Sequence, residues 1–188
     1  MPAAVMEIEH VNIKIFAKEP VEADLAGAIP MFHRWIQESV TLELLVDVAD
    51  YRHVPSGPGV LLVGHEANYS LDLGGNRLGL LYNRKTAFPG DAVEKFKQAY
   101  EAAMQACALI EADPAFQGKL KFDLKHFELI VNDRLLAPNT DETWEALEPE
   151  IEKFCQAQFG GAFGLRREGG PRERFRVVIE SDAPVNAR

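Results

Sequence analysis

The sequence has little cysteine, since Cys107 and Cys155 are the only two among 188 residues. Both fall at apolar positions of predicted helices, which favours small, reduced core residues over a disulfide framework. No apolar run approaches the roughly 18 residues that a membrane span requires. The amino terminus, with Glu7, Glu9 and His10, lacks the pattern of a signal peptide. We therefore expect a soluble cytoplasmic protein.

Basic charge is also scarce. The chain has 20 Lys and Arg against 29 Asp and Glu, which gives a formal net charge of -9 at pH 7. Such a balance disfavours binding to nucleic acid or to anionic membranes, although a local basic patch can survive in an acidic protein. We expect neither nucleic acid nor a membrane among the partners.

Familiar catalytic and nucleotide-binding motifs are missing as well. Gly57, Gly59 and Gly64 are not followed by the lysine and the serine or threonine of a phosphate loop. Ser56 and Ser70 lack the setting of a nucleophile elbow. The sequence therefore identifies no catalytic residue and no cofactor, and it leaves open whether the protein is an enzyme.

What the chain does contain is enough apolar material for one core. With 47% hydrophobic and 26% charged residues, residues 1–188 fit one domain, with a frayed tail from about residue 182. Apolar periodicity and turn residues predict the elements. The first half of the chain should form a strand from residue 11 that ends near residue 20, a helix from about 28, a strand over 42–48, a connection over 54–59 and a hairpin over 60–85. The second half should form a helix over 91–113, a strand over 120–131 with a bulge at 125–126, and a short hairpin strand over 134–137. A helix from 139 or 140, kinked or divided at Pro149, and a last strand over 174–179 complete the prediction.

This order of elements predicts the fold class. Hairpins interspersed among helices favour a largely antiparallel α+β sheet, with three helices packed mainly on one face, over a doubly wound parallel sheet.

The predicted hairpin over 60–85 has a readable register. A turn centred on Gly75-Asn76 pairs Leu71 with Leu80 and Tyr69 with Tyr82 on one apolar face. The same count places His65 on that face, opposite Thr86. A buried imidazole needs a hydrogen-bond partner, a ligand or a metal.

One interpretation of this face is a ligand pocket. His65, Tyr69 and Tyr82 would supply polar-tipped aromatic groups, with Arg84 at the rim, in keeping with pockets that are mostly apolar with a few convergent polar groups. The alternative is an ordinary core from which the tyrosine hydroxyls reach solvent.

A second candidate site is a set of arginines near the carboxyl end. Arg172, Arg174 and Arg176 alternate, so on a strand they project from one face and could hold phosphate, carboxylate or an acidic partner. The alternative is a solvated face paired with the acidic residues nearby.

A third candidate combines Asp47, Asp50, His53 and His65. Two imidazoles with carboxylates could bind zinc, iron or manganese and leave a water for hydrolysis, with Glu66 as a neighbouring base. The spacing matches no compact ligand motif.

The hypothesis that these observations favour is a binding protein for a small polar or anionic ligand, or for a protein partner, and we expect it to be a homodimer. One alternative is a metal-dependent hydrolase or related enzyme that uses the His/Asp cluster. The other is a homodimeric scaffold without a small ligand.

Overall fold

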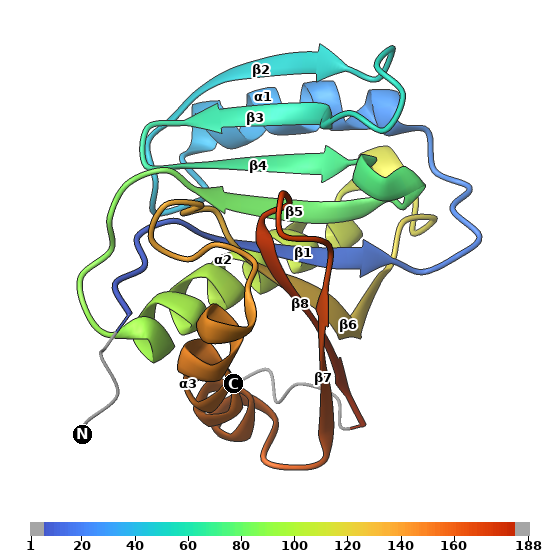
Figure 1. The fold of residues 1–188 in the computed structure, drawn as a ribbon. Helices are drawn as coiled ribbons and strands as arrows, with labels where there is room; N and C mark the ends of the chain where they lie inside the picture. Colours follow the sequence, from blue (N-terminus) through green and yellow to red (C-terminus); the bar gives the residue numbers. More distant parts are fainter. Residues whose placement is uncertain (1–5, 183–188) are drawn as a thin grey trace.

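Alternating apolar and polar residues near the start of the chain form a central strand of the sheet (Figure 1). The computed structural model describes residues 6–182, so the predicted frayed tail beyond Asp182 lies outside the described residues. The strands are β1 (Val11–Ala17), β2 (Leu45–Tyr51), β3 (Gly59–Gly64), β4 (Ala67–Asp72), β5 (Gly79–Arg84), β6 (Phe122–Val131), β7 (Phe163–Glu168) and β8 (Phe175–Ser181). They form one sheet in the order β2-β3-β4-β5-β1-β6-β8-β7, and every neighbouring pair is antiparallel.

Three helices complete the fold: α1 (Ala28–Glu38), α2 (Ala92–Ala112) and α3 (Asp141–Phe159). Helix α1 packs on β2 and β3, α2 packs on β1, β5 and β6, and α3 packs on α2 and β7. The predicted α+β class is therefore confirmed. In the described residues, no helix is long and apolar enough to cross a membrane.

The sequence located the helices well. Asp91 and Glu94 form the reciprocal capping box that starts α2, in the position that the sequence predicts. The predicted effect of Pro149 is wrong in part, because α3 runs as one undivided helix through that residue.

Between residues 67 and 84 the predicted hairpin register is confirmed, with Tyr69 opposite Tyr82 and Leu71 opposite Leu80. The predicted placement of His65 is wrong. Strand β3 ends at Gly64 and β4 begins at Ala67, so His65 and Glu66 form the tight turn of a further hairpin. The His65 side chain is 70% exposed.

The later strands were predicted less accurately. The register of β1 against β6 does shift between Phe122 and Phe127, as the slip in apolar phase predicts. The predicted strand over 134–137 is wrong: Leu136 and Ala137 both donate their backbone N–H to the carbonyl of Asp133, which makes a compact turn. Strand β7 was not predicted, because its residues follow Gly160-Gly161 and carry little apolar alternation.

The strand order contains a repeat. In β1-α1-β4-β5 and in β6-α3-β7-β8, a strand is followed by a helix and a hairpin, and the last strand lies beside the first. The hairpin β2-β3 is the addition that distinguishes the first unit. Strands β1 and β6 are neighbours, so the two units meet at the centre of the sheet.

The two faces of the sheet differ in chemistry. The face toward the helices carries the buried apolar residues, among them Ile13 and Phe127. We call the opposite face, which carries Asn12, Lys14 and Glu128, the polar face. Strands β7 and β8 run steeply across the direction of β2 to β5, so the sheet is strongly twisted (Figure 1).

Candidate functional site

Four arginines gather around one cavity at the end of β6 and the start of β8. We call this cavity of about 260 Å³ the arginine pocket. Its lining residues are Ile130, Arg134, Arg172, Glu173, Arg174 and Arg176. The three arginines singled out in the sequence therefore do converge, although only Arg176 lies within a strand. Arg172 and Arg174 lie in the β7–β8 loop just before Arg176, and the loop after β6 adds Arg134 to them.

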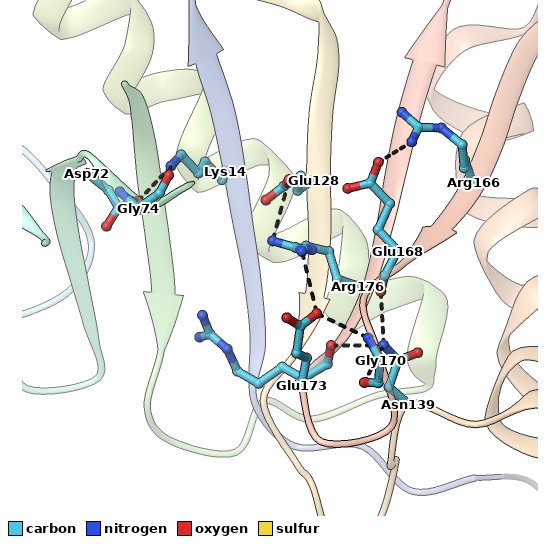
Figure 2. A network of polar contacts seen from close by, with 11 residues as sticks. Lys14, Asp72, Gly74, Glu128, Asn139, Arg166, Glu168, Gly170, Glu173 and Arg176 are labelled. Carbon is cyan, nitrogen blue, oxygen red and sulfur yellow. Dashed lines mark hydrogen bonds and ion pairs between the residues drawn. The ribbon is translucent and has the colours of Figure 1, made fainter. Parts of the chain in front are cut away.

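Asn139 holds these two loops together. Its side-chain Nδ2 donates to the carbonyl of Glu168 at 2.9 Å, and lies 3.4 Å from the carbonyl of Gly170 and 3.5 Å from that of Arg174 (Figure 2). Its neighbour Pro138 forms an isolated β-bridge with Arg174. The loop that follows β6 is thereby fastened to the loop between β7 and β8.

Asp133 fixes the turn that carries Arg134. Its carboxylate accepts the backbone N–H of Glu9 at 2.6 Å and of His10 at 2.8 Å, and it also contacts the His10 ring. Burial acts to raise the pKa of Asp133, but the hydrogen bonds from His10 and Glu9 outweigh burial and hold it below the ordinary value. Arg134 is therefore presented by an anchored turn.

The charges in the arginine pocket do not balance. Arg176 lies between Glu128 and Glu173, with a nitrogen 3.9 Å from a carboxylate oxygen of each (Figure 2). Among residues 6–182, no carboxylate forms an ion pair with Arg134, Arg172 or Arg174. The pocket therefore holds more positive charge than the protein neutralises.

The polar face continues beside the pocket. Asn12 lies directly opposite Ile130 in the β1–β6 ladder and is fully buried, and neither polar atom of its side chain has a partner among the described residues. Opposite residues in an antiparallel pair have Cβ atoms roughly 5 Å apart, so this amide lies next to the pocket floor. Burial also raises the pKa of Glu128, which Arg176 and Lys14 offset only in part.

A larger hollow lies on the helix side, between β4, β5 and α2. We call this cavity of about 670 Å³ the tyrosine cleft. Its lining residues are Leu42, Glu43, Glu66, Tyr69, Arg84, Phe88, Glu94, Lys97, Gln98, Glu101, Ala102 and Gln105. Four of these carry a carboxylate and two carry a positive charge, so the cleft is acidic where the arginine pocket is basic.

Hydrogen bonds connect the polar groups at the base of the cleft. Glu43 accepts the hydroxyl of Tyr69 at 2.9 Å and that of Tyr82 at 3.0 Å, one on each carboxylate oxygen. Gln98 donates to the Tyr82 hydroxyl at 2.8 Å. Burial raises the pKa of Tyr82 to about 12, and burial with the nearby Glu43 raises the pKa of Tyr69 well above its ordinary value. Both hydroxyls therefore stay protonated and are satisfied within the protein.

The structure brings together some of the residues of the pocket predicted from the hairpin. Tyr69 and Arg84 line the tyrosine cleft, and Tyr82 lies beneath it, bonded to two lining residues. His65 lies outside it, on the exposed turn beside Glu66. Ligand binding by the remaining residues stays a prediction.

The residues of the predicted metal cluster do not lie together in the structure. Within residues 6–182, no three His, Cys, Asp or Glu side chains lie together in a way that could hold a metal ion. Asp50 is paired with Arg52 at 2.8 Å, and that hydrogen bond lowers the pKa of Asp50 to about 2. Asp47 accepts the backbone N–H of Val48, while His53 and His65 are exposed on different turns.

Three residues of these sites escaped prediction from the sequence: Arg134, Asn139 and Glu43. Arg134 and Asn139 meet the β7–β8 loop only after folding, some 30 residues along the chain, and no local pattern marks that contact. Glu43 stands between two leucines and looked like part of a strand. In the structure Glu43 precedes β2, and only its contact with Tyr69 of β4 and Tyr82 of β5 shows its role.

Comparison with known proteins adds no relative: the chain matches no protein family, no curated protein and no solved structure. Any inference about function therefore rests on the chemistry of the arginine pocket and the tyrosine cleft.

Proposed function

We propose that the protein binds a small anionic ligand, a carboxylate or a phosphate, in the arginine pocket. One observation carries the proposal: Arg134, Arg172 and Arg174 converge on one cavity without a carboxylate partner among the described residues. In a chain with 29 acidic residues, a surface arginine has many potential partners. Like charges held together repel one another, so such a group is stabilised by an anion from outside.

The chemistry and size of the cavity narrow the ligand. The guanidinium group presents several N–H donors in a planar fork that matches carboxylate and phosphate oxygens. At about 260 Å³, the cavity lies below the roughly 300–1,000 Å³ typical of sites for larger organic ligands. It suits an anion of the size of inorganic phosphate or a small di- or tricarboxylate.

The buried amide of Asn12 supports the same site. A buried amide without a hydrogen-bond partner destabilises a protein by about 1–3 kcal/mol, so its presence beside Ile130 has a cost that packing alone does not explain. Its place next to the pocket floor fits a polar site in this part of the polar face.

The predicted homodimer stays a prediction, and the exposed edge strand β2 offers it limited support. Asp47 and Asp50 lie on that edge, and acidic side chains on an edge strand oppose pairing with a second copy. Sedimentation or light scattering would give the mass in solution.

The experiment that tests the proposal is calorimetric titration of the whole protein with inorganic phosphate and with citrate at low ionic strength. We expect the wild type to bind at least one of them, and Arg172→Gln with Arg174→Gln to weaken that binding by about tenfold or more for each arginine, because a charge-assisted hydrogen bond contributes roughly 1.5–3 kcal/mol.

Arg52→Gln is the matched control. Arg52 follows the edge strand β2 and is already paired with Asp50, so its loss should leave anion affinity unchanged. No binding of either anion by the wild type, or equal binding by the double variant, would overturn the proposal.

A further inference from the structure

Two exposed leucines lie beside the arginine pocket. In the turn that carries Arg134, Leu135 is 99% exposed and Leu136 is 48% exposed. We call Arg134, Leu135 and Leu136 the Arg-Leu-Leu tip. A single exposed leucine is ordinary, but exposed apolar residues that adjoin one another and are rimmed by polar side chains can mark an interaction surface.

The exposure of this tip is built into the fold. The backbone N–H of Leu136 and of Ala137 donate to the Asp133 carbonyl at 3.1 and 2.7 Å, while the Asp133 carboxylate is bonded to residues 9 and 10. Ala137, at the base of the turn, is buried. The leucines are therefore presented outward from an anchored support.

We propose that the Arg-Leu-Leu tip docks on an anionic lipid surface, with the arginine pocket receiving the phosphate of a lipid headgroup. This inference rests on the proposed anion-binding function and names the source of the anion. Protein surfaces that bind membranes reversibly combine basic side chains for the headgroups with apolar side chains that enter the boundary of the acyl region. The tip and the pocket place both kinds of side chain together.

A lipid surface explains more of this region than its two rivals do. A free anion would account for the arginines but would leave Leu135 in water. An acidic protein partner would account for both, but protein interfaces usually seat an apolar anchor in a complementary pocket. A protruding turn beside a pocket of headgroup size suits a lipid layer, which a tip can enter without a preformed socket.

The net charge of -9, on which the expectation of no membrane partner was based, acts differently from this local cluster. Exposed charges farther apart than about 8–10 Å are largely screened at physiological ionic strength. The arginines that face the membrane would therefore dominate the interaction at contact, and the remaining acidic charge would limit its strength. Binding should be reversible and should weaken as salt rises.

The test is flotation of the whole protein with two kinds of vesicle, one of phosphatidylcholine alone and one containing one third phosphatidylglycerol. A parallel titration with glycerol phosphate measures the pocket without a membrane. We expect the wild type to bind the anionic vesicles and glycerol phosphate. Arg172→Gln should reduce vesicle affinity about fivefold, the equivalent of roughly 1 kcal/mol for one basic side chain at an anionic surface.

The leucines separate a membrane site from a simple anion site. Leu135→Ser with Leu136→Ser should lose most vesicle binding and keep the affinity for glycerol phosphate. Leu42→Ser is the matched control, because Leu42 is fully exposed but lines the acidic tyrosine cleft. It should bind vesicles like the wild type.

Each remaining outcome overturns the lipid proposal. If glycerol phosphate binds and the vesicles do not, the anion pocket stands and the membrane role fails. If neither binds, the lipid proposal fails, and the titrations with phosphate and citrate decide whether the anion-binding proposal fails with it. Vesicle binding that survives loss of both leucines would reduce the interaction to surface charge, and binding of polyglutamate in place of vesicles would assign the tip to an acidic protein.

Discussion

The tyrosine cleft and the arginine pocket are opposite in charge and in how their polar groups are satisfied. In the larger cleft, Glu43 accepts two buried tyrosine hydroxyls, so its polar base is bonded within the protein. In the smaller pocket, three guanidinium groups have no carboxylate partner among the described residues. The size of a hollow is therefore a weaker guide to binding than the charge that the protein leaves unbalanced.

From this difference we expect substitutions in the two sites to act differently on stability and on binding. Polar groups that complete one another hold the fold together, and their loss should lower stability. Polar groups left without a partner do not hold the fold together, so their loss should leave stability unchanged or raise it, and where they serve something outside the chain it should weaken binding.

The largest effect on stability should come from the tyrosine cleft. Glu43→Ala removes the acceptor of two buried hydroxyls, those of Tyr69 and Tyr82. We expect a loss of about 2–3 kcal/mol in the free energy of unfolding, measured by urea denaturation. Glu101→Ala, which removes only an exposed ion pair with Lys97, should change it by less than about 0.5 kcal/mol. Equal losses in the two variants would break the comparison.

A gain in stability should come from the amide beside the pocket. Asn12→Leu replaces a buried amide that has no partner among residues 6–182 with an apolar group of similar volume. We expect the free energy of unfolding to rise by about 1–2 kcal/mol. Asn68→Leu on the same face should not show this gain, because Asn68 accepts the backbone N–H of Gly64 at 3.2 Å. A less stable Asn12→Leu would indicate that an ordered water serves this amide.

The anchor of the Arg-Leu-Leu tip should give a pH-dependent effect. The pKa of Asp133 lies below its ordinary value of 3.8, so its carboxylate stabilises the fold in full above that value, and this contribution is lost as pH falls through the lowered pKa. We expect Asp133→Asn to lower the free energy of unfolding by about 1–2 kcal/mol at neutral pH. The difference between the two proteins should shrink in denaturation series carried toward pH 2. A difference that stays constant would exclude the carboxylate charge as its cause.

The smallest effect on stability should come from the unpaired arginines. Arg172→Gln with Arg174→Gln should leave the free energy of unfolding within about 0.5 kcal/mol of the wild type, because no internal ion pair is lost. A slight gain from relieved repulsion is compatible with this expectation. Arg176→Gln should destabilise the fold more, since it leaves the buried Glu128 without its nearest cation. Thermal unfolding of the two proteins side by side would rank them.

Structural features that depend on residues close together in the sequence were predicted more accurately than features that depend on distant contacts. The capping box at Asp91 and the pairing of Tyr69 with Tyr82 depend on residues close in sequence, and both were confirmed. His65 was misplaced because one alternating pattern runs through two successive strands, and a two-residue turn after Gly64 leaves that pattern almost unchanged.

The site depended on distant contacts and was predicted only in part. The arginines at 172, 174 and 176 were recognised by their spacing, but the spacing implied one strand. In the structure Arg172 and Arg174 lie before β8, and Asn139 brings them to Arg134 through contacts with loop carbonyls. Such contacts follow from how α3 and the β7–β8 hairpin pack, and the spacing of apolar residues in the sequence does not predict that packing.

The pairing of β1 with β6 also bears on how the chain folds as it is synthesised. Val11 lies opposite Val131, so the contact at the centre of the sheet closes a loop that spans most of the chain, and such closures are slow. Strands β1 to β5 can assemble first, which leaves one edge of β1 unpaired until β6 emerges. Lys14 lies on that waiting strand, and a charged side chain on an open edge discourages pairing with a neighbouring nascent chain. Its partner Asp72 lies on β4, so the lysine can pair with that carboxylate within the first five strands while it protects the open edge of the growing protein from aggregation.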